Sequence, residues 1–506
     1  MLTFVIGLII LLVGGGLYGA FCQKVFGPDD RKTPAYTKGD GVDYVPMPKW
    51  KNSLINLLNI AGTGPILGPI QGILFGPIAF ITIPIGCVIG GAMHDYFSGM
   101  ISLREGGIQM PELVRMNTNS GIHKLYTLFI CLVTFLVGVV FIYTPGDITA
   151  TQVFGFGGTA GEASTWIIYS AIFVYYLIAA VLPIDKIIGK VYPLFGAVLL
   201  LSAIGVFVML FVKGYPMAEL FGSWNLNGFD FGAYFSSQNF IPSFFVTVAC
   251  GILSGFHSTQ ITLVTRTIQH EKEGRSTFYN MMITEGFIAM VWAAGTMAMI
   301  GAGAENLGIT MQQTESGWAY FMLVEGQLKQ ISATSVVGVV CKNMLGSIGG
   351  IIAIVGVIVL PITSGDTALR SVRLMVGDAL HIKQDKKSKR LLLAIPIFVL
   401  AYICLIVAKV NPNGFNVVWR YFGWSNQTVA IFALASILIW LMQHDKKKYL
   451  WIPLIPLIFY SFVTCSYIMN ANIGIGLPYG VSLAIGAVFS FLVAAYSIYR
   501  GNKKKL

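Results

Sequence analysis

The chain has 506 residues, of which 55% are hydrophobic and only 11% are charged, and its formal net charge is +11. Soluble domains carry about 25% charged residues and cannot hide this much apolar surface in a core, so the surplus must face lipid. The composition excludes a soluble enzyme, and positive charge spread over short loops is a topology signal rather than the mark of a nucleic-acid-binding protein.

Apolar runs of about 20 residues recur along the chain, and Gly, Pro or charged residues separate them. We therefore expect an all-α integral membrane protein with about thirteen transmembrane helices. The first run lacks a basic leader and a small-residue cleavage site, so we expect it to stay as a membrane span. The expected helices are 2–22, 53–75, 77–101, 124–144, 166–183, 191–212, 242–263, 278–301, 336–363, 391–408, 417–441, 449–469 and 479–499.

The placement of positive charge orients these helices. When alternate loops are assigned to opposite sides, most of the 33 Lys and Arg residues fall on one side, including the loop 365–390 and the tail 500–506. The positive-inside rule then predicts a cytoplasmic C-terminus and an N-terminus outside. The exceptions are Lys213, Lys329, Lys409 and Arg420 on the other side, and Lys342 within a helix.

Two segments interrupt their helices at mid-membrane: 61–69, which is rich in Gly and Pro, and 250–259. Pro removes a hydrogen-bond donor and Gly costs about 1 kcal/mol relative to Ala, so neither segment favours a continuous helix. Non-helical backbone at that depth survives where it lines a cavity, and matching breaks in oppositely inserted halves indicate an inverted-repeat transporter. The alternative is that these Gly and Pro residues only allow tight packing.

This pattern predicts four parts of the chain. They are an N-terminal helix with a cytoplasmic linker (1–52), a first five-helix repeat (53–212), a second, inverted five-helix repeat (242–441), and two C-terminal helices with a basic tail (449–506).

Four motifs resemble the carbon starvation protein A (CstA) family over most of the chain. They are Gly39-Asp40-Gly41-Val42-Asp43-Tyr44-Val45-Pro46, Gly62 to Pro69, Gly91-Ala92-Met93-His94-Asp95-Tyr96, and Cys250 to His257. The resemblance implies a bacterial or archaeal cytoplasmic-membrane transporter with a LeuT-like core, related to the amino acid–polyamine–organocation superfamily. It also implies uptake of peptides or pyruvate in nutrient starvation, coupled to protons. This chain is shorter at its C-terminus than better-known members of the family.

Helix breaks expose free N–H groups and the positive end of a half-helix, which suits a carboxylate such as that of a peptide or pyruvate. Hydroxyl groups near the breaks could add hydrogen bonds, although Ser and Thr in helices also bond their own backbone. The candidate substrate-binding residues are Gly62, Thr63, Gly64, Gly68, Gly251, Ser254, Gly255, His257, Ser258 and Thr259.

Ionisable residues inside membrane helices are functional candidates by default. We expect His257 to carry the coupled proton, because imidazole titrates near physiological pH. Glu285 is a second protonatable carrier or one half of a structural pair, and Asp95, next to His94, could act in a gate. Asp366 is a further gate candidate.

The resembled superfamily can hold sodium with a Ser/Thr pair on the helix that here begins near 336. The matching residues are Thr363 and Ser364, and oxygen ligands suit a hard cation. Because the pair lies near the expected end of that helix, the alternative is that its hydroxyls cap the helix.

The sequence therefore predicts a secondary active transporter that imports a small carboxylate-bearing nutrient by proton symport. The alternatives are a sodium-coupled symporter for amino acids or organic acids, and a channel or solute-sensing receptor on the same core. The sequence lacks a P-loop, a zinc-protease helix and a nucleophile elbow, so we expect no enzymatic activity. The expected partners are the solute and membrane lipid, without nucleic acid and without a cofactor besides the coupling ion.

Overall fold

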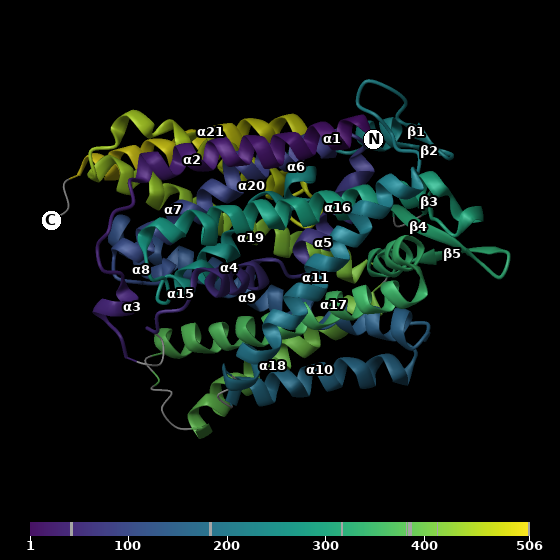
Figure 1. Cartoon of the computed structure of the whole chain (residues 1–506), viewed down its shortest axis with the longest axis horizontal. Helices are drawn as coiled ribbons and strands as arrows, with labels where there is room; N and C mark the ends of the chain where they lie inside the picture. The colour runs from purple at the N-terminus through teal and green to yellow at the C-terminus, as the bar shows by residue number, and fades with distance from the viewer. Residues whose placement is uncertain are drawn as a thin grey trace.

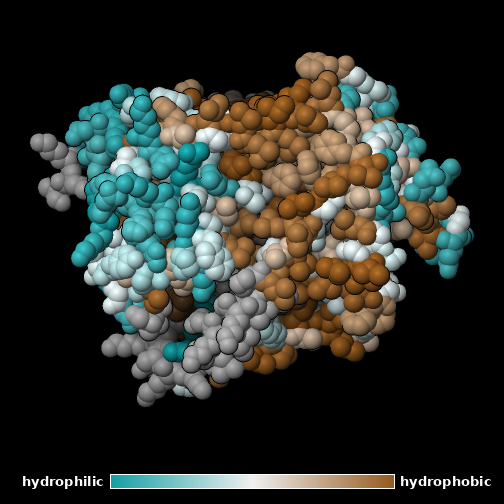
Figure 2. All heavy atoms as spheres, in the orientation of Figure 1, coloured by the Kyte–Doolittle hydropathy of each residue, from teal (hydrophilic) through white to brown (hydrophobic). Residues whose placement is uncertain are grey.

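The computed structural model forms one helical bundle with most helices running along its long axis (Figure 1). Hydrophobic side chains make a broad band across its middle, and hydrophilic side chains gather at both ends (Figure 2). The N-terminus and the far end of the last described helix (Tyr479–Asn502) lie at opposite ends of the long axis (Figure 1). The structure describes residues 1–40, 44–181, 185–314, 317–380, 382, 387–411 and 413–503.

The first part of the chain is helical throughout. Its helices are α1 (Leu2–Ile9), α2 (Gly15–Phe26), α3 (Pro34–Thr37), α4 (Lys49–Ile60), α5 (Gly64–Gly72), α6 (Ala79–Gly86), α7 (Met93–Arg104), α8 (Met110–Asn117), α9 (Ser120–Ile148), α10 (Ala163–Val181) and α11 (Asp185–Lys213). A π-helical turn joins α1 to α2, and another (Cys87–Ala92) joins α6 to α7, so each pair is one continuous rod.

The second part adds short strands at the end of the bundle that carries the N-terminus (Figure 1). Its elements are β1 (Asn225–Leu226), β2 (Phe229–Asp230), α12 (Phe231–Ser237), α13 (Phe240–Thr247), α14 (Ala249–Ile252), α15 (Gly255–Val264), α16 (Asn280–Ala302), β3 (Thr310–Thr314), β4 (Gly317–Val324), β5 (Gln327–Ile331), α17 (Ala333–Ala379), α18 (Lys387–Val410), α19 (Gly414–Gln443), α20 (Trp451–Asn470) and α21 (Tyr479–Asn502).

Ten helices among the described residues are long and apolar enough to cross a membrane. The number is eleven if α4 and α5, which meet at an angle of 50°, count as one span. The other expected spans, 166–183 and 242–263, correspond to a shorter apolar helix (Ala163–Ile178) and to the three short helices α13, α14 and α15. The chain is a multi-pass membrane protein with a mostly helical fold.

The structure confirms that both Gly-containing segments interrupt their helices. The first helix leaves helical geometry at Ala61 and resumes at Gly64, so Pro69 lies inside α5 and the break is shorter than the expected segment. The second break consists of the extended residues Leu253 and Ser254. His257 was expected in this break, but it lies in the first turn of α15.

Two expectations about local structure are wrong. The segment before α17, expected to be a loop, forms an antiparallel sheet in which β4 pairs with both β3 and β5. The helix expected to end at Thr363 and Ser364 continues as α17 to Ala379, so these residues do not cap its end. A helix satisfies its own backbone hydrogen bonds and can therefore run on past the apolar layer, where hydropathy gives no further signal.

Candidate functional site

Four ionisable side chains meet in the interior of the bundle. They are His94 and Asp95 on α7, His257 on α15 and Glu285 on α16, and each is no more than 1% exposed. Asp95 bridges the two imidazoles: its Oδ1 is 2.8 Å from His94 Nδ1 and its Oδ2 is 3.0 Å from His257 Nδ1. The other nitrogen of His257, Nε2, is 3.4 Å from Glu285 Oε2. The cluster thus joins Asp95, His257 and Glu285, which were each expected to take part in proton coupling or gating.

Glycines allow the three helices of this cluster to approach closely. A Cβ on Gly91, just before α7, would lie 2.4 Å from the carbonyl oxygen of Ile252, and a Cβ on Gly286 would lie 2.6 Å from Cys87 Sγ. Both distances are too short for a Cβ atom, so neither position has room for a side chain. Gly91 therefore packs α7 against the second break, and Gly286 packs α16 against the π-helical turn, so that His257 is held between Asp95 and Glu285.

The hydrogen-bond pattern fixes which nitrogens can take up a proton. An ionised carboxylate only accepts hydrogen bonds, so each Nδ1 that faces Asp95 carries the hydrogen. In a neutral ring, Nε2 is then the free base. His94 Nε2, His257 Nε2 and both carboxyl oxygens of Glu285 make no hydrogen bond within the described part of the chain. A proton can therefore reside on His257 Nε2 or on Glu285, and the choice changes the charge of both groups.

Asn426 was not among the expected site residues. It provides a hydrogen-bond partner for a backbone N–H group that the second break leaves free. Its Oδ1 accepts a hydrogen bond from the backbone N–H of Phe256 at 2.8 Å and lies 3.2 Å from Ser254 Oγ. Its Nδ2 donates toward Cys250 Sγ at 3.4 Å. The side chain is fully buried on α19. The backbone N–H freed at this break thus has a protein partner. The sequence signal that could have pointed to Asn426 is the polar pair Asn426-Gln427 inside an apolar run.

The glycines expected to bind substrate pack the two breaks against each other and against α19. A Cβ on Gly64 would lie 2.2 Å from Cys250 Cβ, one on Gly251 would lie 2.9 Å from Ala289 Cβ, and one on Gly255 would lie 2.4 Å from backbone atoms of Ala430 and Asn426. A Cβ on Gly68 would lie 3.1 Å from the Thr247 carbonyl oxygen, and one on Gly62 would lie 2.4 Å from Phe141. The breaks are therefore adjacent in space.

The candidate hydroxyls have different partners. Ser258 Oγ and Thr259 Oγ1 donate to carbonyls of their own helix, those of Gly255 and Phe256. Ser254 pairs with Asn426. Thr63 Oγ1, at the first break, is buried and has no hydrogen-bond partner within the described residues. In this conformation Thr63 is the candidate hydroxyl with a hydrogen bond to offer.

Of the expected sodium residues, Ser364 lies next to the first broken helix. Its Oγ is 3.4 Å from the carbonyl oxygen of Leu58 on α4, three residues before the break. The side chains of Thr363 and Asp366 lie outside the described part of the structure, which shows only that both residues sit within α17.

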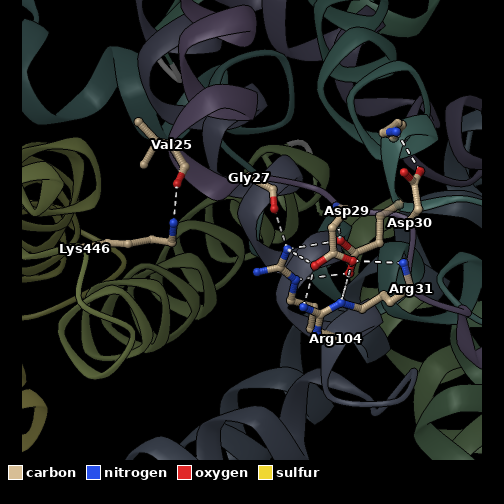
Figure 3. Close-up of polar contacts among 9 residues, drawn as sticks. Val25, Gly27, Asp29, Asp30, Arg31, Arg104 and Lys446 are labelled. Carbon is tan, nitrogen blue, oxygen red and sulfur yellow. Dashed lines mark hydrogen bonds and ion pairs between the residues drawn. The ribbon is translucent and has the colours of Figure 1, made fainter.

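A second group of charges lies between the segment after α2 and the end of α7 (Figure 3). Arg104, at the end of α7, donates from Nε and Nη2 to the carboxylate of Glu271, both at 3.1 Å. The Asp29 backbone N–H donates to Glu271 Oε2 at 3.0 Å, and Arg31 Nε lies 3.6 Å from Oε1. Arg31 also pairs with the Asp29 carboxylate at 2.7 Å. These contacts tie the segment after α2 to α7.

Comparisons with known proteins agree on the type of protein. The family model described as carbon starvation protein CstA matches residues 1–151, 130–319 and 326–467. An uncharacterized membrane protein of Haemophilus influenzae is 41% identical over 58% of this chain and 89% of its own length. The peptide transporter CstA of Escherichia coli is 26% identical over 88% of this chain and 77% of its own. The pyruvate/proton symporter BtsT of Escherichia coli is 23% identical over 90% and 79%.

Among solved structures, a manganese transporter of Eremococcus coleocola aligns with a TM-score of 0.55. The alignment covers 91% of this chain and 97% of the transporter, with 10% sequence identity. At this identity the likeness shows the fold alone: the chain shares its overall fold with this transporter.

Proposed function

The chain belongs to the CstA family of membrane transporters, and from this premise we propose that it imports a short peptide or pyruvate by proton symport. The observation that carries the proposal is the buried cluster, in which His257 Nε2 and Glu285 are paired with each other and with no further partner among the described residues. A site that binds one proton, in the membrane interior and next to a broken helix, is what proton coupling needs.

The architecture we propose is a pair of inverted five-helix repeats, 53–212 and 242–441, within about thirteen spans. A preceding helix (1–52) and two following helices (449–506) flank them, with the N-terminus outside. The contact between Gly64 and Cys250 supports this arrangement, because it brings together the breaks of the two repeats.

In the proposed mechanism, the substrate carboxylate binds where the two breaks meet, at Thr63 and the start of α15. Protonation of His257 adds a positive charge in the first turn of α15, near the positive end of that half-helix, and so strengthens carboxylate binding. The carboxylate and the proton then cross together, with no net charge on the pair. Asp95 keeps the ring oriented through Nδ1. When the substrate leaves, the proton passes from Nε2 to Glu285 and from there to the inside, which returns both groups to their starting state.

Uptake into proteoliposomes tests this function. We expect radiolabelled dialanine or pyruvate to accumulate against its gradient when an inward proton gradient is imposed. Accumulation that requires a sodium gradient instead would contradict proton coupling. It would favour the second candidate function, a sodium-coupled symporter that uses Ser364 and Thr363, for which the distance of 3.4 Å between Ser364 Oγ and the Leu58 carbonyl is the specific observation. Passive flux that never exceeds equilibrium would indicate a channel.

A further inference from the structure

A cavity of about 630 Å³ lies at the end of the bundle that carries the N-terminus and the short strands. We call it the outer cavity, because the positive-inside rule predicts that this end faces outward. Its lining residues include Gln71 from α5, Phe75 from the 3-10 turn that follows α5, Thr247 from α13, Thr334 from α17 and Arg420 from α19. Strand β4 also contributes, and its Tyr320 donates a hydrogen bond of 2.5 Å to the Ile70 carbonyl.

The outer cavity adjoins the proposed substrate site. Thr247 ends α13, and one residue later the short helix α14 begins, which leads into the second break. Its carbonyl oxygen would lie 3.1 Å from a Cβ on Gly68, so α5 and α13 are in contact there. A solute in the cavity therefore rests against both broken helices from one side.

Arg420 is the one charged side chain among the described residues that line the cavity. It is exposed, and within the described part of the chain no ion pair joins it to a carboxylate. Lys409, a second cation, already forms an ion pair: its Nζ is 2.6 Å from Asp147 Oδ1, and both side chains are almost fully buried. Asp147 in turn accepts hydrogen bonds from Ser332 and Thr334. Arg420 is thus left to attract an anion from solution.

The rest of the lining offers hydrogen bonds and aromatic surface. Gln71 Nε2 is buried at the α5 side of the cavity without a hydrogen-bond partner in the described residues. Asn239 and Asn470, both in the lining, are joined by a hydrogen bond of 2.8 Å from Asn239 Nδ2 to Asn470 Oδ1. Side-chain amides complement peptide groups, since both carry a donor and an acceptor. The remaining amides of the lining are those of Gln238, Gln330, Asn413, Asn416 and Asn472, and its larger rings are those of Tyr143, Tyr234, Trp318, Phe415 and Tyr467.

We propose that the outer cavity is a capture site for short peptides, in which the Arg420 guanidinium binds the C-terminal carboxylate and the amide side chains bind peptide groups. The proposal rests on the proposed function, to which it adds a second site before the breaks. A volume of 630 Å³ lies in the usual range for peptide-sized ligands and far exceeds the needs of a three-carbon acid. Arginine suits this role because its planar fork meets both oxygens of a carboxylate.

Protection of an engineered cysteine tests the capture site without relying on transport. Asn416 lines the cavity and is exposed, so the thiol of Asn416→Cys should react with a charged methanethiosulfonate reagent. The measurement uses the full chain in detergent, which needs no gradient and no assumed orientation, and the parent protein gives the background from the native cysteines. We expect dialanine to slow the labelling, and dialanine amide, which lacks the carboxylate, to need about a tenfold higher concentration for the same effect.

Arg420 variants, made in the Asn416→Cys protein, show whether the guanidinium is responsible. Arg420→Gln should raise the protecting concentration of dialanine about tenfold and remove its preference over dialanine amide, and Arg420→Lys should lie between. Phe221→Cys is the matched control, because Phe221 is 94% exposed and does not line the cavity. Its labelling should not respond to dialanine.

Three outcomes would overturn the capture site: no protection by dialanine, equal protection by dialanine amide, or equal protection in Arg420→Gln. Protection by pyruvate at the same concentration as dialanine would overturn the assignment to peptides. If dialanine is accumulated in proteoliposomes but does not protect, the capture site fails and the proposed transport stands. If dialanine protects but is not driven by a proton gradient, the proposed transport fails and the capture site stands.

Discussion

Glu271 and Glu285 are both buried acids in the second half of the chain, but their surroundings are opposite. Glu271 is 1% exposed and receives two hydrogen bonds from Arg104 and one from the Asp29 backbone, with Arg31 close by. Glu285 is 0% exposed, its carboxyl oxygens receive no hydrogen bond among the described residues, and the ionisable group that it faces is His257 at 3.4 Å.

The different partners of Glu271 and Glu285 distinguish a structural ion pair from a functional one inside a membrane protein. Arginine remains protonated under all physiological conditions, so the pairing of Glu271 with Arg104 is permanent and serves to hold segments together. Histidine changes its charge near neutral pH, so the pairing of Glu285 with His257 can be made and released. Burial alone does not distinguish these roles, whereas the kind of partner does. Both interpretations can be tested by exchanging one group at a time.

The largest expected effect is on transport. Glu285→Gln removes the group that exchanges the proton with His257 and keeps the side chain's size, so proton-driven accumulation in proteoliposomes should fall by at least about tenfold. Counterflow exchange of labelled against unlabelled solute, which needs no proton movement, should continue. Glu305→Gln is the control, because Glu305 is exposed just beyond the end of α16. Full accumulation by Glu285→Gln would show that this carboxyl is structural, like Glu271.

The next effect is on stability. Arg104→Gln leaves the Glu271 carboxylate buried with a weaker set of partners, so the free energy of unfolding should fall by about 3 kcal/mol. Thermal unfolding in detergent measures the change, and the ratio of protons to solute in the surviving protein should be unaltered. Arg115→Gln removes an arginine from the exposed pair with Glu112 and should change the melting temperature little. An altered ratio of protons to solute in Arg104→Gln would instead show that the ion pair of Arg104 with Glu271 takes part in the transport cycle.

A smaller effect is expected at the second break. Asn426→Ala removes the acceptor for the Phe256 N–H and should cost about 1–2 kcal/mol. Thr428→Ala, on the same helix, removes a hydroxyl that bonds only its own helix and is the matched control. Thermal unfolding again gives the measurement. If Asn426→Ala were as stable as Thr428→Ala, the break would not depend on this cap.

The smallest effect is a change in stability with pH at the exposed pair of Asp29 and Arg31, next to Glu271. The hydrogen bond from Arg31 holds the pKa of the Asp29 carboxyl well below its ordinary value of 3.8. Because the folded pKa is the lower one, Asp29 stabilises the fold above pH 3.8 and this contribution is lost as the pH falls below that value. Asp29→Asn should therefore be slightly less stable than the parent at pH 7, and the difference should shrink progressively as the pH falls below 3.8 toward the lowered pKa of the folded state. A difference that grows with acid would contradict the sign of this shift.

The sequence predicts the broken helices and the ionisable candidates because both have local causes. Gly and Pro weaken a helix wherever they cluster, and Asp95, His257 and Glu285 are exceptional in apolar runs by themselves. Their meeting could not be predicted, since it depends on how Gly91 and Gly286 let α7, α15 and α16 pack. The cap by Asn426 lies 170 residues from Phe256 along the chain, a contact that no local pattern encodes.

Hydropathy did not predict the end of α17 or the strands β3 to β5. It indicates where a helix leaves the apolar layer, but not where the helix itself ends, so α17 was expected to stop at Ser364 instead of Ala379. The strands β3 to β5 lie in a segment that is too polar to span a membrane and was expected to be a loop. Their pairing depends on the turn at Glu325 and Gly326, both with positive φ, and on Tyr320 reaching the Ile70 carbonyl.

The central claim is that the proton held between His257 and Glu285 is the one that moves with the solute. It is tested most directly by following lumenal pH with a trapped dye in proteoliposomes while dialanine or pyruvate enters, in the parent and in His257→Gln. The parent should acidify the lumen in step with uptake. His257→Gln should still exchange solute in counterflow but should no longer acidify the lumen. Acidification by His257→Gln at the parent's ratio of protons to solute would show that the coupled proton does not pass through His257.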